Sequence, residues 1–242
     1  LLLAFTACTT DTLVPTATAQ STLSSFNPEE FGAGESAEAA EVLLEKEYTE
    51  TSAAIEADLL EKARVLTVPA GSVDAIAEAI AQVGKPGVVR LATGDPTETD
   101  HLIISSSVTL VGEEGARILF PNTTIVPAQL PIISAVHVLG ANRVRIKGIE
   151  LVPEGGPGGT ALLVQNSPNT FIANVTAENW QFGLISEKSP RLYVGKSTFV
   201  GSSQWQTDRT FSCFGIENLN GERVRVFSIT IQNTVFGIWA CD

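Results

Sequence analysis

The sequence predicts an all-β fold, a parallel β-helix (solenoid) whose coils stack along one axis, and three observations support this expectation. Four related segments of seventeen residues begin at Ala135, Ala161, Gly183 and Gly215, and the closest pair starts 22 residues apart. Residues that favour bends recur at two positions of each segment, and apolar residues alternate with polar ones between the bends. A repeat of 22 residues is too short for a helix that crosses between parallel strands, so directly stacked coils are expected.

The positions within the repeat predict which side chains point inward. Positions six and fourteen hold the bend residues Gly140, Asn166, Lys188 and Asn220, then Gly148, Asn174, Lys196 and Ser228. Positions ten and twelve are mostly apolar, with Val144, Ile146, Ile172, Leu192, Val194, Val224 and Val226. Successive coils stack about 4.8 Å apart, so equal positions should form ladders. We therefore expect Val144, Leu192 and Val224 to line one interior wall.

An amphipathic helix is predicted at residues 72–83, before the first coils. An uncovered first coil would expose unpaired strand edges, so we expect this helix to be the amino-terminal cap of a β-helix that spans residues 65–242. Serine at the capping position, apolar residues at helical spacing and a Gly-x-Pro end define it: Ser72, Val73, Ile76, Ile80, Val83, Gly84 and Pro86. At the other end, residues 237–242 begin a further coil without a cap, which suggests that the sequence is a fragment.

Residues 1–64 are expected to precede this body as an export signal and a leader. Residues 1–19 are typical of a signal remnant, and residues 20–64 of a flexible tether with an acidic helix. Two cleavage sites stay open: a lipobox that ends at Cys8, which would be lipidated, and an ordinary signal site before Gln20. Either site exports the protein, to the outer membrane, the periplasm, the cell surface or the medium. The acidic helix carries an apolar stripe at Leu44, Tyr48, Ile55 and Leu59.

Charge and cysteine usage exclude several classes of function. The net charge is −12, and the segment from Glu29 to Arg64 alone holds eleven acidic and three basic residues. A chain without a long basic stripe is not expected to bind nucleic acid. No apolar run of about 18 residues occurs, so membrane contact is expected only through a lipid at Cys8. Cys213 and Cys241 fall at different positions of their coils, so buried thiols are expected rather than a disulfide.

The order of these elements resembles a known group of proteins. An amphipathic helix, VVRL, a polar turn, SVTLVGEEGARI and units such as NTFIANVTAENWQFGL are similar to the right-handed parallel β-helix proteins of the pectin-lyase-like superfamily. The resemblance covers roughly residues 65–242 and implies a right-handed coil. Many members bind, cleave or epimerise polysaccharides, whereas others are adhesins or structural spikes. It therefore implies an exported protein that binds or processes a polysaccharide, with a non-catalytic surface or structural role as the alternative.

The outward ladders provide the candidate substrate-binding residues. Guanidinium groups bind carboxylates bidentately, and aromatic rings stack on the apolar faces of sugars, so an acidic polysaccharide is the expected ligand. The alternative is a solvated face with scattered arginines, because like charges about 5 Å apart repel by only ~1 kcal/mol in water. The candidates are Arg143, Arg191 and Arg223 at position nine, Arg145, Tyr193 and Arg225 at position eleven, and Trp205 in the longest inserted loop. Asn169 and Phe171 complete the two ladders.

No catalytic residue is identified from the sequence, so a polysaccharide lyase or glycoside hydrolase activity is left open. Arg145-Ile146-Lys147 resembles a substrate-holding motif of polygalacturonases, but that family's Asn-Thr-Asp, Asp-Asp and Gly-His-Gly motifs are absent, so we treat the match as coincidence. Acidic residues do not repeat at one position of neighbouring coils, as an inverting hydrolase requires. Arg191 or Lys196 could serve a lyase, although nothing singles them out.

No metal or cofactor is expected. Asp95, Glu98 and Asp100 could hold calcium, but their spacing fits a solvated turn better than a calcium loop. His101 and His137 occupy different positions of adjacent coils, so a site shared by the two is not expected.

Overall fold

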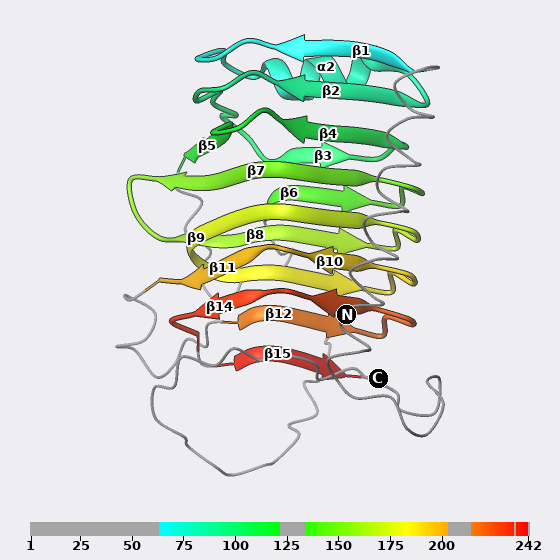
Figure 1. Cartoon of the computed structure of the whole chain (residues 1–242), viewed down its shortest axis with the longest axis vertical. Coiled ribbons are helices and arrows are strands. Elements are labelled where there is room, and N and C mark those ends of the chain that lie inside the picture. Colours follow the sequence, from blue (N-terminus) through cyan, green and yellow to red (C-terminus); the bar gives the residue numbers. More distant parts are fainter. Residues whose placement is uncertain (1–62, 122–133, 203–213, 235, 242) are drawn as a thin grey trace, which may run out of the picture.

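The computed structural model describes residues 63–121, 134–202, 214–234 and 236–241. In this part of the chain, parallel strands form one curled sheet and a single short helix lies at one end (Figure 1). The elements are β1 (Arg64–Val68), α2 (Ala75–Val83), β2 (Gly87–Leu91), β3 (Leu102–Ile104), β4 (Val108–Gly112), β5 (Arg117–Pro121), β6 (Ser134–Leu139), β7 (Arg145–Glu154), β8 (Gly158–Gln165), β9 (Phe171–Glu187), β10 (Tyr193–Gly195), β11 (Thr198–Gly201), β12 (Phe214–Leu219), β13 (Arg225–Phe227), β14 (Thr230–Gln232) and β15 (Phe236–Cys241).

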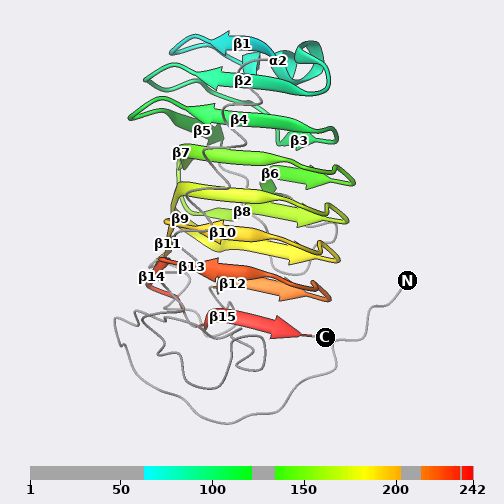
Figure 2. The same ribbon diagram turned by 45° about the vertical axis from the view of Figure 1, so that its right-hand side comes forward.

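The strands stack in three runs. The first is β1-β2-β4-β7-β9-β10-β13, and the second is β3-β6-β8-β9-β12-β15. The third is β5-β7-β9-β11-β14. Strand β9 is long enough to take part in all three. Figure 2 shows the strands lying one above another along a single axis, and every pairing is parallel, which confirms the expectation of a mainly β fold with parallel strands.

The core lies between these runs, and the repeat places its residues correctly. Val144 and Leu192 are fully buried, and Val224 packs against the same core, so the expected interior wall is confirmed. The expected bends are also confirmed, because all eight bend residues have left-handed backbone, with φ between 48° and 68°. Five of the eight are glycine or asparagine, which tolerate this conformation, and the other three are Lys188, Lys196 and Ser228.

A seam of buried serine hydroxyls joins consecutive sequence repeats at one corner of the sheet. The Ser167 hydroxyl accepts a hydrogen bond from the Ala141 amide at 3.1 Å, and the Ser189 hydroxyl accepts one from the Ser167 amide, also at 3.1 Å. Both serines are fully buried. The hydroxyls thus supply acceptors to backbone amides that water cannot reach.

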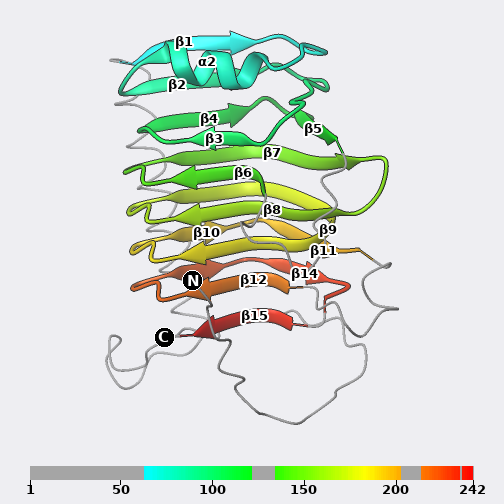
Figure 3. The same cartoon turned by 180° about the vertical axis from the view of Figure 1, so that it is seen from behind.

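The predicted cap helix is confirmed in place but not at its amino end. Helix α2 contacts β1, β2 and β3, and it buries Ile76, Ile80 and Val83 (Figure 3). It begins at Ala75 rather than Ser72, so the expected cap is wrong: the Ser72 hydroxyl donates to the Pro69 carbonyl instead. Val73 was expected on the apolar face of the helix, but it precedes the helix and is 62% exposed.

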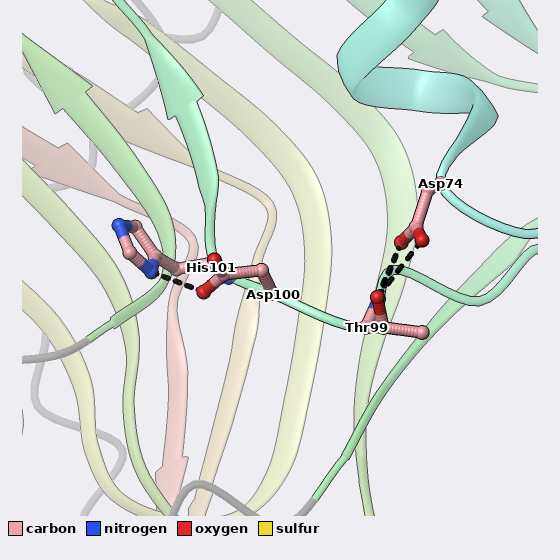
Figure 4. A network of polar contacts seen from close by, with 4 residues as sticks. All are labelled: Asp74, Thr99, Asp100 and His101. Carbon is pink, nitrogen blue, oxygen red and sulfur yellow. Dashed lines mark hydrogen bonds and ion pairs between the residues drawn. The ribbon is translucent and has the colours of Figure 1, made fainter.

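The carboxylate of a distant residue, Glu98, caps this end of the helix, whereas the side chain of the N-cap residue Asp74 does not. Asp74 precedes the helix, and its carboxylate accepts hydrogen bonds from the amide and the hydroxyl of Thr99 (Figure 4). Glu98 is only 2% exposed, and its carboxylate accepts a 2.8 Å hydrogen bond from the Ile76 amide, one of the donors that a helix leaves unpaired. A cap supplied 22 residues downstream fixes the helix to the third run of the sheet, since Glu98 also donates its own amide to the Leu119 carbonyl.

Several sequence predictions fall outside the described residues. The signal remnant, the tether, the acidic helix, Cys8, Trp205 and Cys213 are among them. Cys241 lies on β15, and the proposed absence of a disulfide stays a prediction. None of the helices in the described part of the chain is long and apolar enough to cross a membrane.

Candidate ligand-binding face

The outward side of the first run of strands carries the candidate residues. Arg145 on β7 pairs in register with Phe171 on β9, which pairs with Tyr193 on β10, which pairs with Arg225 on β13. Each of these residues neighbours an inward side chain in its strand, Ile146, Ile172, Val194 or Val226, all of which lie in or against the core. Four residues that span eighty positions of sequence therefore form one continuous ladder on the surface.

Aromatic rings occupy the middle of this ladder. The rings of Phe171 and Tyr193 are 6.3 Å apart, with an interplanar angle of 37°. The Arg225 guanidinium lies over the Tyr193 ring, 5.4 Å from its centroid, and Arg225 Nη1 donates to the Tyr193 hydroxyl at 3.2 Å. These contacts hold the phenol and the guanidinium in fixed positions relative to each other.

A second ladder of residues lies beside the first on the same strands and packs against the Phe171 ring. Lys147, Ala173, Gly195 and Phe227 pair in register two positions further along the strands. Phe227 and Ala173 form a small apolar cluster with Phe171, separate from the main core. A Cβ atom at Gly195 would overlap the Phe227 ring, so glycine at this position is what lets the ring lie flat against the sheet.

We name the basic face as the outward side of residues 143–148, 169–174, 191–196 and 223–228. These segments contain seven lysine or arginine residues and no carboxylate, although the whole chain has a net charge of −12. The nearest acidic residues along the sequence, Glu150 and Glu222, lie just outside. Positive potential is therefore concentrated on one surface of an acidic protein.

Arg145 is a cation whose surroundings disfavour its charge. It is half-buried, and among the described residues no carboxylate lies within ion-pair distance of its guanidinium. Burial lowers the pKa of Arg145, and the like charge of Arg143 lowers it further. Both effects mean that the charged form is disfavoured where it stands, so an anion placed against Arg145 would be stabilised.

The arginines at position nine differ from the sequence expectation. Arg143, Arg191 and Arg223 are exposed as expected, but each has left-handed backbone, with φ of 59°, 58° and 56°. This conformation costs an arginine about 1 kcal/mol, and Asn169 occupies the equivalent place in the remaining coil. Sequence reasoning placed the three arginines on the strand face, whereas they lie at the bend where the chain enters it. The Ser-Pro-Arg order before Leu192 was the available signal for a turn.

The other candidate groups do not combine into a site. Asp95 accepts two hydrogen bonds from Arg117, at 2.7 and 2.8 Å, and the Arg117 guanidinium lowers the pKa of Asp95. Asp100 lies 2.6 Å from Nδ1 of His101 (Figure 4), while Glu98 caps α2. The three carboxylates thus have separate partners. Within the described ranges, no group of three or more histidine, cysteine, aspartate or glutamate side chains is placed to hold a metal.

Two partly buried titratable groups lie on the second run, His137, which the sequence analysis considered only together with His101, and Glu217, which it missed. Burial raises the pKa of Glu217 on β12 and lowers that of His137 on β6. They belong to the same ladder, but Leu163 and Ile185 stand between them. Three strand spacings, about 14 Å, are too far for direct proton transfer. Glu217 and His137 therefore do not form an acid–base pair.

Comparison with known proteins adds little to this picture. No protein-family model matches the sequence. No curated protein matches it either. A crystal structure from Parabacteroides merdae ATCC 43184, described as a "putative glycosyl hydrolase", is similar over 72% of this chain and 98% of its own, with 10% identity and a TM-score of 0.31. At these values the similarity is distant, and it assigns no residue a role.

Proposed function

We propose that this chain is a right-handed parallel β-helix of the pectin-lyase-like kind, and that its basic face binds an acidic polysaccharide. The observation that carries the proposal is the ladder of Arg145, Phe171, Tyr193 and Arg225, in which two neighbouring, mutually tilted rings lie between cations. Rings offer an apolar surface to a pyranose, and the guanidinium groups above and below them offer paired donors to carboxylates.

The spacing of the ladder suits a polymer. Neighbouring strands lie about 4.8 Å apart, which is close to the length of one sugar unit along a chain, so successive sugars would meet successive strands. The left-handed arginines support the same ligand. Arg143, Arg191 and Arg223 are exposed at the bends where the chain enters this face, so their guanidinium groups add donors for carboxylates beside the rings.

The basic face is proposed to bind the polysaccharide, and no catalytic step is assigned to it. A lyase, hydrolase or epimerase activity would require a base or a pair of carboxyls next to the bound sugar, and the described part of the basic face offers cations only. Export, with a lipid at Cys8 or cleavage before Gln20, completes the proposal, because acidic polysaccharides of this kind occur outside the cytoplasm. An adhesin-like or structural role would be favoured if no polysaccharide bound.

Titration of the full chain with polygalacturonate, alginate and the neutral polymer dextran tests the proposal. We expect binding of an acidic polymer that weakens with salt, and a loss of roughly tenfold or more for Tyr193→Ala. Thr198→Ala, on the outward side of β11, is the matched control and should bind like the parent. Ultraviolet absorbance of unsaturated products would reveal a lyase. If neither the full chain nor the leader variant described below bound any uronate polymer, the proposed function would be wrong.

A further inference from the structure

The leader enters the fold at the same corner as the position-nine arginines. Strand β1 is the first rung of the first run, and Val65 stands in register above Val88, Thr109 and then Arg145. Residues that precede Arg64 therefore leave the sheet on the side of its strand-entry bends, where Arg143, Arg191 and Arg223 lie.

From this placement we propose that the acidic leader, residues 29–62, docks on the basic face of its own chain and competes there with the acidic polysaccharide. The competition rests on the proposed function, whereas the docking does not. The leader is named as the occupant because of its charge, its apolar stripe and its reach.

The charges of the two surfaces are complementary. Residues 29–62 contain eleven acidic and two basic residues, whereas the four segments of the basic face contain seven lysine or arginine residues and no aspartate or glutamate. A leader carboxylate placed against the half-buried guanidinium of Arg145 would offset the burial and the repulsion by Arg143 that disfavour its charge, without any second molecule.

The apolar parts match as well. The predicted stripe of Leu44, Tyr48, Ile55 and Leu59 is flanked on both sides by acidic residues, Glu45, Glu47, Glu56 and Asp58. The basic face has the same pattern in reverse, since the rings of Phe171 and Tyr193 are surrounded by lysine and arginine. An acidic amphipathic helix could cover the rings and meet cations along both of its edges.

The leader is also long enough. Arg145 lies three strand spacings below β1, about 14 Å, and Arg225 lies six spacings below it, about 29 Å. Residues 36–62 would extend about 40 Å as a helix at 1.5 Å per residue. A helix that ran down from Arg64 along the corner would therefore pass every rung of the basic face. Tethering raises the effective concentration of such a segment to the millimolar range, so even weak contacts would hold it.

Zero-length carbodiimide cross-linking of the full chain, followed by mass spectrometry, tests the docking alone. We expect amide cross-links from Lys147 and Lys196 to leader carboxylates. These cross-links should be lost in about 1 M salt, because the Debye length falls to about 3 Å there and the attraction between the charges is screened. Lys85 precedes β2 beside Arg64, where the leader joins the sheet, so cross-links to Lys85 report only the tethering of the leader. Leader cross-links that form at Lys85 but avoid Lys147 and Lys196 would overturn the docking.

A matched pair of full-chain variants tests the competition. Glu45→Gln, Glu47→Gln, Glu56→Gln and Asp58→Asn together remove the flanking charges of the leader. Glu113→Gln, Glu114→Gln, Glu154→Gln and Glu178→Gln remove the same charge from exposed positions of the body. We expect the leader variant to bind polygalacturonate or alginate about tenfold more tightly than the parent, and the body variant to stay within about twofold.

The outcomes separate the two proposals. Equal binding by both variants, with cross-links absent, would reject the docking and leave polysaccharide binding in place. Cross-links to Lys147 and Lys196 without binding of any uronate polymer would reject the proposed function and keep the docking. Tighter binding by the leader variant supports both.

Discussion

Replacement of Ser189 by alanine is the sharpest test of the serine seam. The Ser189 hydroxyl accepts from the Ser167 amide at 3.1 Å and donates its one proton to a carbonyl, either Glu187 at 2.9 Å or Val164 at 3.1 Å. Because both serines are fully buried, Ser189→Ala leaves the Ser167 amide without an acceptor and out of reach of water. An unsatisfied buried donor costs about 1–3 kcal/mol, so we expect the free energy of unfolding to fall by about 2 kcal/mol.

Urea unfolding followed by far-ultraviolet circular dichroism measures this change, with Ser105→Ala at an exposed position as the control. Hydrogen exchange localises it, since the Ser167 amide should lose protection before its neighbours do. A cost below about 0.5 kcal/mol, the level of an ordinary surface substitution, would show that the seam does not join the coils as described.

Three further predictions follow from the core, the outer ladder and the helix cap. Leu192→Ala, at a fully buried position of the interior wall, should lower the free energy of unfolding by about 2–5 kcal/mol in the same urea assay. Gly195→Ala should cost about 1–3 kcal/mol, because the added methyl group overlaps the Phe227 ring; an unchanged midpoint would contradict the packing. Burial raises the pKa of Glu98, so the native state holds the proton of the Glu98 carboxyl group more tightly than the unfolded chain does. The stabilisation from this group should therefore be present at acidic pH and be lost as the pH rises through the raised pKa. Glu98→Gln should flatten that slope above about pH 4, the ordinary pKa of a glutamate, and an identical slope would be evidence against it.

The ladders could be predicted because the repeat carries the information locally. Two bend positions bracket each strand, and alternation between them decides which side chains face inward, so the register of Arg145, Phe171, Tyr193 and Arg225 follows once coils are assumed to stack. The same logic placed Val144, Leu192 and Val224 in one wall. Neither result needed knowledge of distant parts of the chain.

The errors arose where distant residues override local signals. Ser72 followed by apolar residues at helical spacing is typical of a helix start, but the carboxylate of Glu98 reaches the Ile76 amide from 22 residues downstream and the helix begins later. Arginine is rarely a turn residue, so the left-handed bend at Arg143 had no compositional signal. The burial that disfavours the charge on Arg145 likewise depends on neighbours that only the fold assembles.

The register of the first run has a consequence for how such a chain can change its length. Partners in the ladder lie 26 residues apart from Arg145 to Phe171, 22 apart from Phe171 to Tyr193 and 32 apart from Tyr193 to Arg225, yet each step rises by one strand. An insertion at a corner is therefore absorbed outside the stack, whereas one extra residue within a strand would exchange its buried and exposed sides. Evolution can lengthen this molecule freely at its corners, and loops that reach over a neighbouring face are the form in which new specificity would arise.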